Sequence, residues 1–357
     1  MSPDISEFTT PGRVSVIFDG QFGSTGKGLA GAWVGEHNKI DWAVTNASAN
    51  AGHTSIIDGK PVVLFHIPST WLTAREHWNT RIYIDAGAIV DLDVLEREIV
   101  ELGIPARQIW VNPNAAVILP EDKASESNNG SSQARIASTQ KGCGAALARK
   151  VVRSGPNLGQ WIAQTGRKVP FTLDTVPLNR ELRDMKTVVV EVPQGFSLSV
   201  GASGFYPYTT SRDCTLQQGL SDAGVHPRFF HKSMAVLRTF PIRVGNIVDG
   251  EDQIGFSGPV YPDQVETSWR DLGLAEERTT VTKRVRRVFT FSPLQYQRML
   301  EYSMPDYVFL NFANYMDSDS MNRLVGSMAR VEVEVGQTPK YFYGYGPASH
   351  DILENLA

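Results

Sequence analysis

The sequence predicts an α/β fold with a large, mostly parallel central sheet, helices on both faces and irregular insertions. Residues 14–18 are a β-branched and apolar run that leads into a glycine-rich loop, and residues 28–37 are small and apolar, as in a helix packed on a sheet. A helical pattern over residues 91–102 is stopped by Gly103 and Pro105. We expect further strands at residues 41–45, 62–67, 81–85, 109–119, 187–192, 240–244 and 307–310.

Length and composition bound the class of protein. The 357 residues suit one large α/β domain with elaborations or two domains, and 41% hydrophobic and 20% charged residues are ordinary for a folded chain. The net charge of -4 argues against a general nucleic-acid-binding surface, although residues 283–287 form a local basic patch. Cys143 and Cys214 are the only cysteines, so no disulfide framework is implied and a reducing compartment is expected.

The N-terminus and the hydropathy indicate a cytoplasmic protein. Residues 1–12 are polar and contain Pro3 and Pro11, so we expect a flexible tail there. This segment lacks the basic and apolar regions of a signal peptide, and no later run is long and apolar enough to span a membrane. We therefore expect neither a membrane partner nor secretion.

The glycine-rich loop, residues 20–28 with the sequence GQFGSTGKG, predicts a phosphate-binding site, and we call it the phosphate loop. Glycines let backbone N–H groups approach an anion closely, Lys27 supplies positive charge, and the following helix offers its N-terminus. The loop departs from the Walker A pattern, because five residues separate Gly20 from Gly26 and Gly28 follows the lysine. A glycine-rich strand-to-helix turn without a ligand is the alternative.

A second polar segment follows the strand expected at residues 41–45. Asn50, Gly52, His53 and Thr54 crowd together there, and ligands collect at the carboxyl ends of strands in an open α/β sheet. A histidine tied into a loop by hydrogen bonds is the alternative for His53. The phosphate loop earlier in the chain favours a role in the site.

Two basic segments are candidates for anion binding. Residues 138–155 repeat a glycine-rich turn that feeds a basic helix, which predicts a second phosphate-binding element or a solvated helix. In residues 279–289, arginines alternate with Thr and Val, which suits carboxylate or phosphate recognition or an exposed strand. We expect residues 122–135 to be a mobile loop or an exposed helix, residues 199–215 to be an irregular functional loop, and residues 246–274 to cover the surface.

With these pieces placed, the chain resembles adenylosuccinate synthetase along nearly its whole length. The family's phosphate loop, GxQWGDEGKG, stands here as residues 20–28, its NAGHT motif is intact at residues 50–54, and its purine monophosphate loop, GTTGRGIGP, resembles ASTQKGCGA at residues 137–145. Four further motifs keep the family's order and spacing. EVPQG resembles the family's EGAQG and places Gln194, and YPYTTSR resembles YPYVTSS and places Thr210. PIRVG resembles STRVG and places Arg243 and Val244, and VTKRVRR resembles TTGRRRR and places Val281, Thr282, Arg284 and Arg286.

The resemblance implies one domain over residues 1–357 and a two-step ligase reaction, in which a purine 6-oxygen is phosphorylated and aspartate displaces the phosphate. It implies catalytic roles for Ser24, Lys27 and His53. Implied triphosphate-binding residues are Gly23, Thr25, Gly26, Lys27, Gly28, Gly52, His53, Thr54, Asn311, Asn314, Gly346 and Pro347. Implied purine monophosphate-binding residues are Ser24, Asn50, Ser138, Thr139, Arg153, Gln194, Thr210 and Val244. Implied aspartate-binding residues are Val281, Thr282, Arg284 and Arg286, and implied Mg²⁺ ligands are Ser24 and Gly52. Since the arginine matching Arg153 reaches a partner's nucleotide in the family, a homodimer is expected.

Position 24 is the main departure from the family. The family has an aspartate there that takes the proton from purine N1 and binds magnesium, whereas this chain has Ser24. Serine is no base at neutral pH, and loss of a positioned general base costs roughly a hundred- to ten-thousand-fold in rate. A 2-amino group on the purine would compete with a carboxylate for space, whereas the hydroxyl can accept from a guanine edge. The substitution resembles the viral branch of the family, which converts deoxyguanylate (dGMP) to a succinylated 2-aminoadenine nucleotide for 2-aminoadenine DNA.

A second departure concerns the base of the triphosphate. The family's guanine-reading TKLD aligns with NFAN at residues 311–314. An aspartate accepts two hydrogen bonds from guanine, whereas Asn314 offers one acceptor and one donor, so strict GTP preference should be lost. We expect ATP or dATP as phosphoryl donor, while Gly346 and Pro347 match the family's other base-contacting turn.

Three alternatives stay open. One is an ordinary adenylosuccinate synthetase acting on inosinate (IMP). Another is a catalytically silent nucleotide-binding regulator, which need not keep Lys27, His53 and the arginine cluster. The third is a P-loop kinase, against which Gly28 in place of Ser or Thr counts. A viral protein would act in the host cytoplasm on dGMP, L-aspartate and ATP or dATP, with no nucleic-acid partner.

Overall fold

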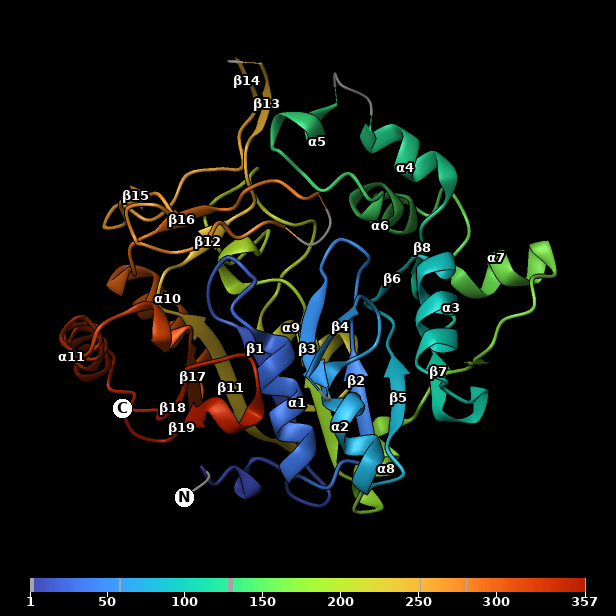
Figure 1. Ribbon diagram of the computed structural model, residues 1–357. Helices are drawn as coiled ribbons and strands as arrows, with labels where there is room; N and C mark the ends of the chain where they lie inside the picture. Colours follow the sequence, from blue (N-terminus) through green and yellow to red (C-terminus); the bar gives the residue numbers. More distant parts are fainter. Residues whose placement is uncertain (1–2, 58, 128–130, 251, 280–281, 357) are drawn as a thin grey trace.

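The computed structural model describes residues 3–57, 59–127, 131–250, 252–279 and 282–356. Its centre is a ten-stranded sheet with the strand order β19-β18-β17-β11-β1-β10-β2-β5-β7-β9 (Figure 1). Neighbouring strands pair in parallel except at one edge, where β18 and β19 are antiparallel. The predicted α/β class with a mostly parallel sheet is confirmed.

Most of the strands expected from the sequence belong to this sheet. Its members are β1 (Val14–Asp19), β2 (Trp42–Thr45), β5 (Arg81–Ile84), β7 (Ile109–Val111), β9 (Thr172–Leu173), β10 (Val188–Glu191), β11 (Phe230–Arg238), β17 (Tyr307–Asn311), β18 (Lys340–Gly344) and β19 (Ile352–Leu353). Smaller sheets pair β3 (His53–Ile57) with β4 (Lys60–Leu64), β6 (Ile89–Val90) with β8 (Ala116–Val117), β13 (Ile247–Asp249) with β14 (Asp252–Gly255), and β16 (Arg287–Phe289) with β12 (Ile242–Arg243) and β15 (Glu266–Thr267).

Helices cover both faces of the large sheet (Figure 1). The α-helices of the described residues are α1 (Lys27–His37), α2 (Ser69–His77), α3 (Leu92–Glu101), α4 (Pro120–Ser127), α5 (Ser132–Arg135), α6 (Cys143–Val152), α7 (Leu158–Thr165), α8 (Leu178–Arg183), α9 (Leu216–Asp222), α10 (Pro293–Ser303) and α11 (Ser318–Val335). In β1, Val16 belongs to the hydrophobic cluster of Leu220 in α9 and Met299 in α10, whereas Ile17 belongs to that of Trp33 in α1. Successive side chains of a strand point to opposite faces, so an uninterrupted apolar run fits a strand buried on both.

The expected strand at residues 109–119 is wrong as a single element. It divides into β7 and β8 at a turn around Asn112, whose side chain accepts from Asn114 N at 2.8 Å and donates to the Tyr83 hydroxyl at 2.7 Å. The Ala115 N–H donates to Asn112 O at 3.0 Å. Asparagine favours such turns because its side chain bonds the backbone two residues on.

The expected flexible tail at residues 1–12 is wrong for the described part of that segment. Ile5 and Phe8 are 1% and 0% exposed and belong to the same hydrophobic cluster as α1. These two apolar side chains tie an otherwise polar segment to the core, because removing them from water stabilises the packed arrangement.

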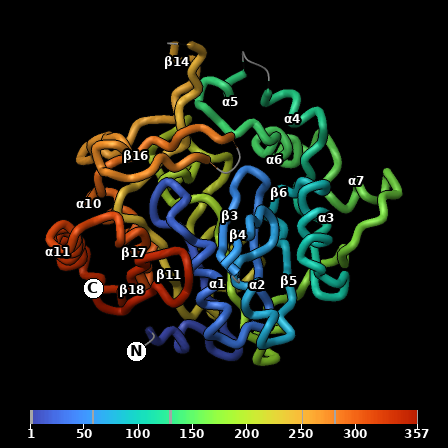
Figure 2. The backbone as a smooth tube through the Cα atoms, viewed as in Figure 1, coloured from blue at the N-terminus to red at the C-terminus, as the bar shows by residue number. Residues whose placement is uncertain are grey.

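The carboxyl ends of the parallel strands face a layer of loops and short elements. In Figures 1 and 2 this layer contains α4, α5 and α6 on one side and the β12–β16 region on the other, with the blue loop after β1 between them. The segment at residues 122–135, expected as a mobile loop or exposed helix, is helical where it is described. Within the described ranges, no helix is long and apolar enough to cross a membrane.

Candidate active site

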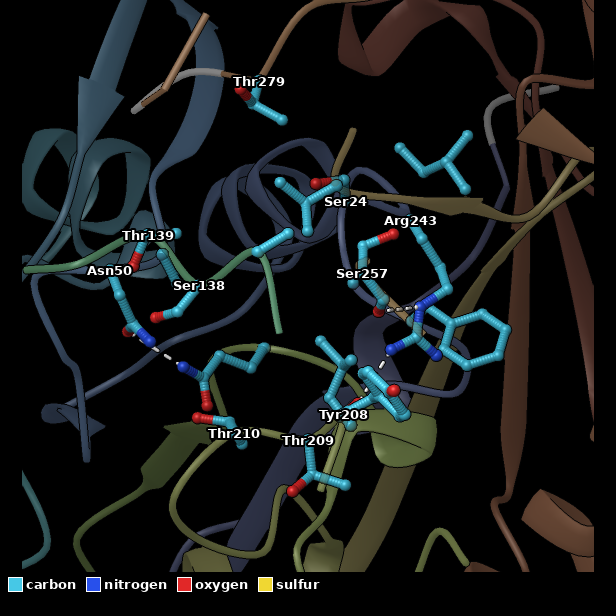
Figure 3. Close-up of a pocket in the computed structure, with 18 of the residues that line it drawn as sticks. Ser24, Asn50, Ser138, Thr139, Tyr208, Thr209, Thr210, Arg243, Ser257 and Thr279 are labelled. Atoms are coloured by element: carbon cyan, nitrogen blue, oxygen red, sulfur yellow. Dashed lines mark hydrogen bonds between the residues drawn. The ribbon is translucent and has the colours of Figure 1, made fainter. Parts of the chain in front are cut away.

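A cavity of about 790 Å³ opens at this carboxyl edge, walled by segments far apart in the sequence. In Figure 3, Ser24 and Thr279 lie on one side, Thr209 and Thr210 on the opposite side, and Asn50, Ser138 and Thr139 on a third. The wall contains most of the predicted site residues: Gly23, Ser24, Thr25, Gly26, Lys27, Gly28, Asn50, Gly52, His53, Thr54, Ser138, Thr139, Gln194, Thr210, Val244 and Arg286. Among the described residues, predicted ones outside the wall are Arg153, Thr282, Arg284, Asn311, Asn314, Gly346 and Pro347. Val281 lies outside the described residues.

The phosphate loop folds around a buried carboxylate, that of Asp19 at the end of β1. Asp19 accepts from the N–H groups of Gln21, Gly23 and Thr25 at 2.9, 3.2 and 3.3 Å and from the Thr25 hydroxyl at 2.6 Å. The Lys27 ammonium lies 3.3 Å from the same carboxylate. Asp19 is 1% exposed and is absent from the cavity wall, so it supports the loop from below.

The opposite side of the loop is left for a ligand. The described structure gives no protein acceptor to the N–H groups of Ser24, Gly26, Lys27 and Gly28, which lie in the cavity wall where α1 begins. Gly26 has φ 94, and a Cβ there would lie 2.0 Å from Asn311 Nδ2, so only glycine suits the turn. Free N–H groups at a helix N-terminus bind anions such as phosphate.

Lys27 and Gln194 connect the phosphate loop to the next part of the wall. Lys27 Nζ donates to Gln194 O at 2.6 Å, and Gln194 Nε2 donates to Asn50 Oδ1 at 2.9 Å. Gln194 has φ 66, an uncommon value for a residue other than glycine. These bonds place the Lys27 ammonium between the Asp19 carboxylate and the Gln194 backbone carbonyl, and they join Gln194 to Asn50.

His53 begins the β3–β4 hairpin and lines the cavity beside Gly52 and Thr54. Burial, together with the positive charge of Lys27, lowers the pKa of His53. The imidazole is therefore neutral at pH 7 in the ligand-free protein, and it can donate one hydrogen bond to an oxygen in the cavity.

The second phosphate-binding element differs from the one expected. The N-terminus of α6 is capped by Glu126, whose carboxylate accepts from Gly142 N at 2.7 Å and Ala145 N at 3.1 Å. A phosphate cannot take the same two donors without displacing that carboxylate. Ser138 and Thr139, which precede the helix and line the cavity, are the groups left to meet a ligand.

The basic segment brings Arg286 to the cavity wall, where it donates from Nη1 to the Ser24 hydroxyl. Arg284 is used differently: its Nη2 donates to Ala137 O at 3.0 Å and Ser138 O at 3.1 Å, and its Nε to Thr282 Oγ1 at 3.1 Å. Its Nη1 is buried and has no partner among the described residues.

Arg243, which the family motif placed, supports the wall. It donates to the carbonyl oxygens of Ser257 and Tyr208 at 2.9 and 2.7 Å (Figure 3) and to that of Pro259 at 3.0 Å. Burial lowers the pKa of Arg243 to about 9. Its guanidinium therefore holds two loops together.

The residues expected to meet the triphosphate base follow two adjacent strands. Asn311 ends β17, and its side chain donates to Thr25 O at 3.2 Å, so it positions the phosphate loop. Asn314 is exposed beyond β17, and Gly346 and Pro347 follow β18, which pairs in parallel with β17. Phe312, between the two asparagines, lines the cavity.

Sequence reasoning missed Asp19, Arg238, Glu277 and Phe312. Asp19 carried a usable signal, since it directly precedes the phosphate loop. Glu277 had no signal of its own, and Arg238 lies in β11, a strand that the pattern did not reveal.

The sequence of this chain is similar to those of known proteins over most of its length. A sequence profile of the adenylosuccinate synthetase family matches residues 16–169 and 158–318. The N6-succino-2-amino-2'-deoxyadenylate synthase of Salmonella phage PMBT28 is 37% identical, with 95% of this chain and 97% of the phage protein covered. The adenylosuccinate synthetase of Thermococcus sibiricus is 31% identical, with 77% of this chain and 76% of that protein covered.

Among solved structures, the cyanophage S-2L succinoaminodeoxyadenylate synthetase, bound to dGMP and dATP as an energy donor, has the same fold. It superposes with a TM-score of 0.83 at 33% identity, over 96% of this chain and 95% of the cyanophage protein. Because the family profile and these relatives span most of the sequence, the chain belongs to the adenylosuccinate synthetase family.

Proposed function

We propose that this chain joins L-aspartate to C6 of dGMP, driven by hydrolysis of ATP or dATP, and forms N6-succino-2-amino-2'-deoxyadenylate. The observation that carries the proposal is Ser24 at the cavity wall, where the family has a carboxylate. A small hydroxyl leaves room for the 2-amino group of guanine and can accept a hydrogen bond from it. The name of the phage relative and the dGMP in the cyanophage structure support the same substrate.

The first step transfers the γ-phosphoryl group to the purine 6-oxygen as the N1 proton leaves and ADP or dADP departs. Lys27 and the free N–H groups of the phosphate loop hold the phosphates, since positive charge and backbone donors stabilise the transferring group. His53, neutral and beside Lys27, donates a hydrogen bond to the transferring oxygen. Thr25, Gly52 and Thr54 complete this side of the cavity wall.

The second step is attack of the aspartate amine on C6, with loss of phosphate and of one amine proton. Thr282, Arg284 and Arg286 hold the aspartate carboxylates, for which guanidinium groups have the matching two-pronged geometry. The unpartnered Nη1 of Arg284 supports this assignment, because a buried donor without an acceptor is costly. Val281 is assigned with them from the motif alone.

The purine monophosphate takes the side of the cavity formed by Asn50, Ser138, Thr139, Gln194, Thr210 and Val244. Loss of the N1 proton lacks the family's base, and we assign it to a water held by Ser24. A Ser24→Ala variant as active as the wild type would exclude this relay.

The donor is ATP or dATP because Asn314 replaces the aspartate that reads guanine. Asn311, Asn314, Gly346 and Pro347 form the base side, at the ends of the adjacent strands β17 and β18. The dATP in the cyanophage structure supports this choice.

Mg²⁺ is implied by the family and fits part of the donor set. The described residues contain no group of three or more His, Cys, Asp or Glu that could hold a metal. Mg²⁺ is usually bound through substrate phosphates with few protein oxygens, so the Gly52 carbonyl would suffice as the protein ligand. The Ser24 hydroxyl, the other implied ligand, already accepts from Arg286, and its second lone pair is needed for the guanine edge. The bound ion would neutralise charge on the phosphates.

A homodimer accounts for Arg153. This residue is exposed at the end of α6, outside the cavity wall, next to Val151 and Val152, which are 66% and 68% exposed. Apolar side chains this exposed suit an interface, and in such a dimer Arg153 would contact the nucleotide of the partner subunit.

The test measures phosphate release with aspartate, Mg²⁺ and ATP, comparing dGMP with IMP, followed by mass detection of the product. Turnover with dGMP and a succinylated product supports the proposal. Turnover with IMP alone would identify ordinary purine synthesis, and inactivity with both would favour a nucleotide-binding regulator.

A further inference from the structure

Two arginines hold Ser24, the residue at which this chain departs from its family. Arg286 donates to the Ser24 hydroxyl, and Arg238 donates from Nη1 to Ser24 O at 3.1 Å. Ser24 has φ 57, in the left-handed region that is unfavourable for a residue other than glycine. Contacts to both the backbone and the side chain therefore fix where the hydroxyl points.

One carboxylate joins these two arginines. Glu277 accepts from Arg238 Nη2 at 2.6 Å and Nη1 at 3.1 Å, and its Oε2 lies 3.9 Å from Arg286 Nε. Arg238 is 0% exposed and stacks on the Phe312 ring with its guanidinium 4.0 Å from the ring centroid. A two-pronged arginine–carboxylate pair fixes orientation as well as distance, so Glu277 sets the geometry of both cations.

Glu277 also balances the positive charges of Arg238 and Arg286. Burial by itself raises the pKa of Glu277, but the charges of Arg238 and Arg286 outweigh it and lower the pKa, so this carboxyl is ionised at neutral pH. Without that charge, two guanidinium groups would face each other around one serine. Their mutual repulsion would move Arg286 away from the hydroxyl, because Arg286 is the less buried of the two and Arg238 is also stacked on Phe312.

We propose that Glu277 is a positioning residue for purine recognition, which acts through Arg238 and Arg286 to aim the Ser24 hydroxyl at the guanine edge of the substrate. The Arg286 bond uses one of the two lone pairs of Ser24 Oγ and leaves one to accept from guanine N1–H or the 2-amino group. The proposal rests on the proposed function, because it assumes dGMP as the substrate.

A double-mutant cycle tests it with the full-length protein. The kcat/KM for dGMP and the KM for ATP are measured for the wild type, Glu277→Gln, Ser24→Ala and the double variant. We expect Glu277→Gln to lower kcat/KM for dGMP about tenfold to a hundredfold, the range of coupling between residues in one network. The double variant should lose little more than Ser24→Ala alone, the ratio of dGMP to IMP turnover should fall, and the KM for ATP should stay within about twofold.

Glu266→Gln is the matched control. Glu266 also binds an arginine with both carboxylate oxygens, at 2.8 and 2.6 Å from Arg287 Nε and Nη2, but it lies outside the cavity wall. This variant should keep the wild-type kcat/KM. Thermal unfolding checks that Glu277→Gln is folded, and Glu277→Asp, which keeps the charge, replaces it in the cycle if it is not.

The outcomes separate the two proposals. If the losses in kcat/KM multiply in the double variant, Glu277 acts independently of Ser24. If Glu277→Gln is as active as the control, Glu277 has no role. Each of these results overturns the inference and leaves the proposed function standing. A wild-type protein that turns over IMP and not dGMP overturns the proposed function, and the inference with it.

Discussion

Two aspartates at the carboxyl edge of the sheet have similar local sequences and opposite surroundings. Asp19 ends β1 and Asp85 follows β5; each comes after an apolar run and is soon followed by glycine, as IFDG and IDAG. Both are buried, at 1% and 0% exposure. Asp19 has three N–H donors, a hydroxyl and an ammonium around it. Asp85 accepts from Gly87 N at 2.9 Å, while its Oδ2 has no partner among the described residues.

The surroundings of Asp85 change its pKa. Burial, and then the nearby Asp222 carboxylate, raise the pKa of Asp85 well above its ordinary value. Asp19, in contrast, is in contact with the Lys27 ammonium and accepts four hydrogen bonds, from Gln21, Gly23 and Thr25. A buried carboxylate is tolerated when its hydrogen bonds and counter-charge are complete, and it is held neutral when they are not. Asp19 therefore organises the phosphate loop through its donors and the ammonium of Lys27, whereas Asp85, with one hydrogen bond, has a raised pKa.

The same isosteric substitution at both positions gives the largest expected contrast. Asp19→Asn removes the charge facing Lys27 and turns one acceptor into a donor, so we expect the free energy of unfolding to fall by about 3 kcal/mol, as for a broken buried pair. Phosphate release should be lost with it, because the phosphate loop depends on those bonds. Urea unfolding at pH 7 and the ligase assay measure the two effects.

Asp93→Asn is the control for that variant, since Asp93 is 75% exposed in its ion pair with Arg167. It should change the free energy of unfolding by less than about 0.5 kcal/mol. If Asp19→Asn behaves like Asp93→Asn, the carboxylate of Asp19 does not organise the loop and the contrast with Asp85 disappears.

Lys27→Met sharpens the comparison, because it removes the cation and keeps the other donors of Asp19. Four hydrogen bonds to the carboxylate remain, from Gln21, Gly23 and Thr25. The free energy of unfolding should therefore fall less than in Asp19→Asn. Turnover should fall by about a hundredfold to a thousandfold, the cost of losing one group that stabilises transferring charge.

The matched control is Lys340→Met, whose ammonium pairs with Glu354 at 2.8 Å near the surface. Its kcat should equal that of the wild type. A Lys27→Met variant with normal turnover would show that the ion pair with Asp19 is the whole purpose of that lysine.

Parts of the fold and site that are continuous in the sequence could be predicted from it. The phosphate loop and residues 50–54 each follow an apolar strand, and their glycines and polar groups are adjacent, so composition was enough to locate them. β11 was missed although it lies between β1 and β17, because in Phe230–Arg238 the first residue is followed by His, Lys and Ser, which gives neither a clean apolar run nor a clean alternation.

Contacts between distant segments could not be predicted. Ser24 and Arg286 are 262 positions apart, and Arg238, at the end of β11, is 39 positions from Glu277. The motif suggested an aspartate-binding role for Arg286 and said nothing of a bond to Ser24. The contrast between Asp19 and Asp85 has the same origin, since the groups around Asp85 come from α6, α9 and residue 212.

The smallest expected effect is that of Asp85→Asn, and its sign is opposite to that of Asp19→Asn. The pKa of Asp85 in the native state is raised above 3.8, the ordinary value that applies to the unfolded chain. Between these two pKa values the native state holds a proton on Asp85 and the unfolded state does not. The free energy of unfolding of the wild type is therefore highest at low pH with respect to this group, and falls as pH rises through the native pKa. The amide that Asp85→Asn introduces keeps the acceptor for Gly87 N and removes the titration. The free energy of unfolding of the variant should therefore be within about 1 kcal/mol of the wild-type value at pH 5 and rise relative to the wild-type value at pH 8. Urea unfolding at both pH values measures the gain, and a loss that grows with pH would show that the native state favours the charged form of Asp85.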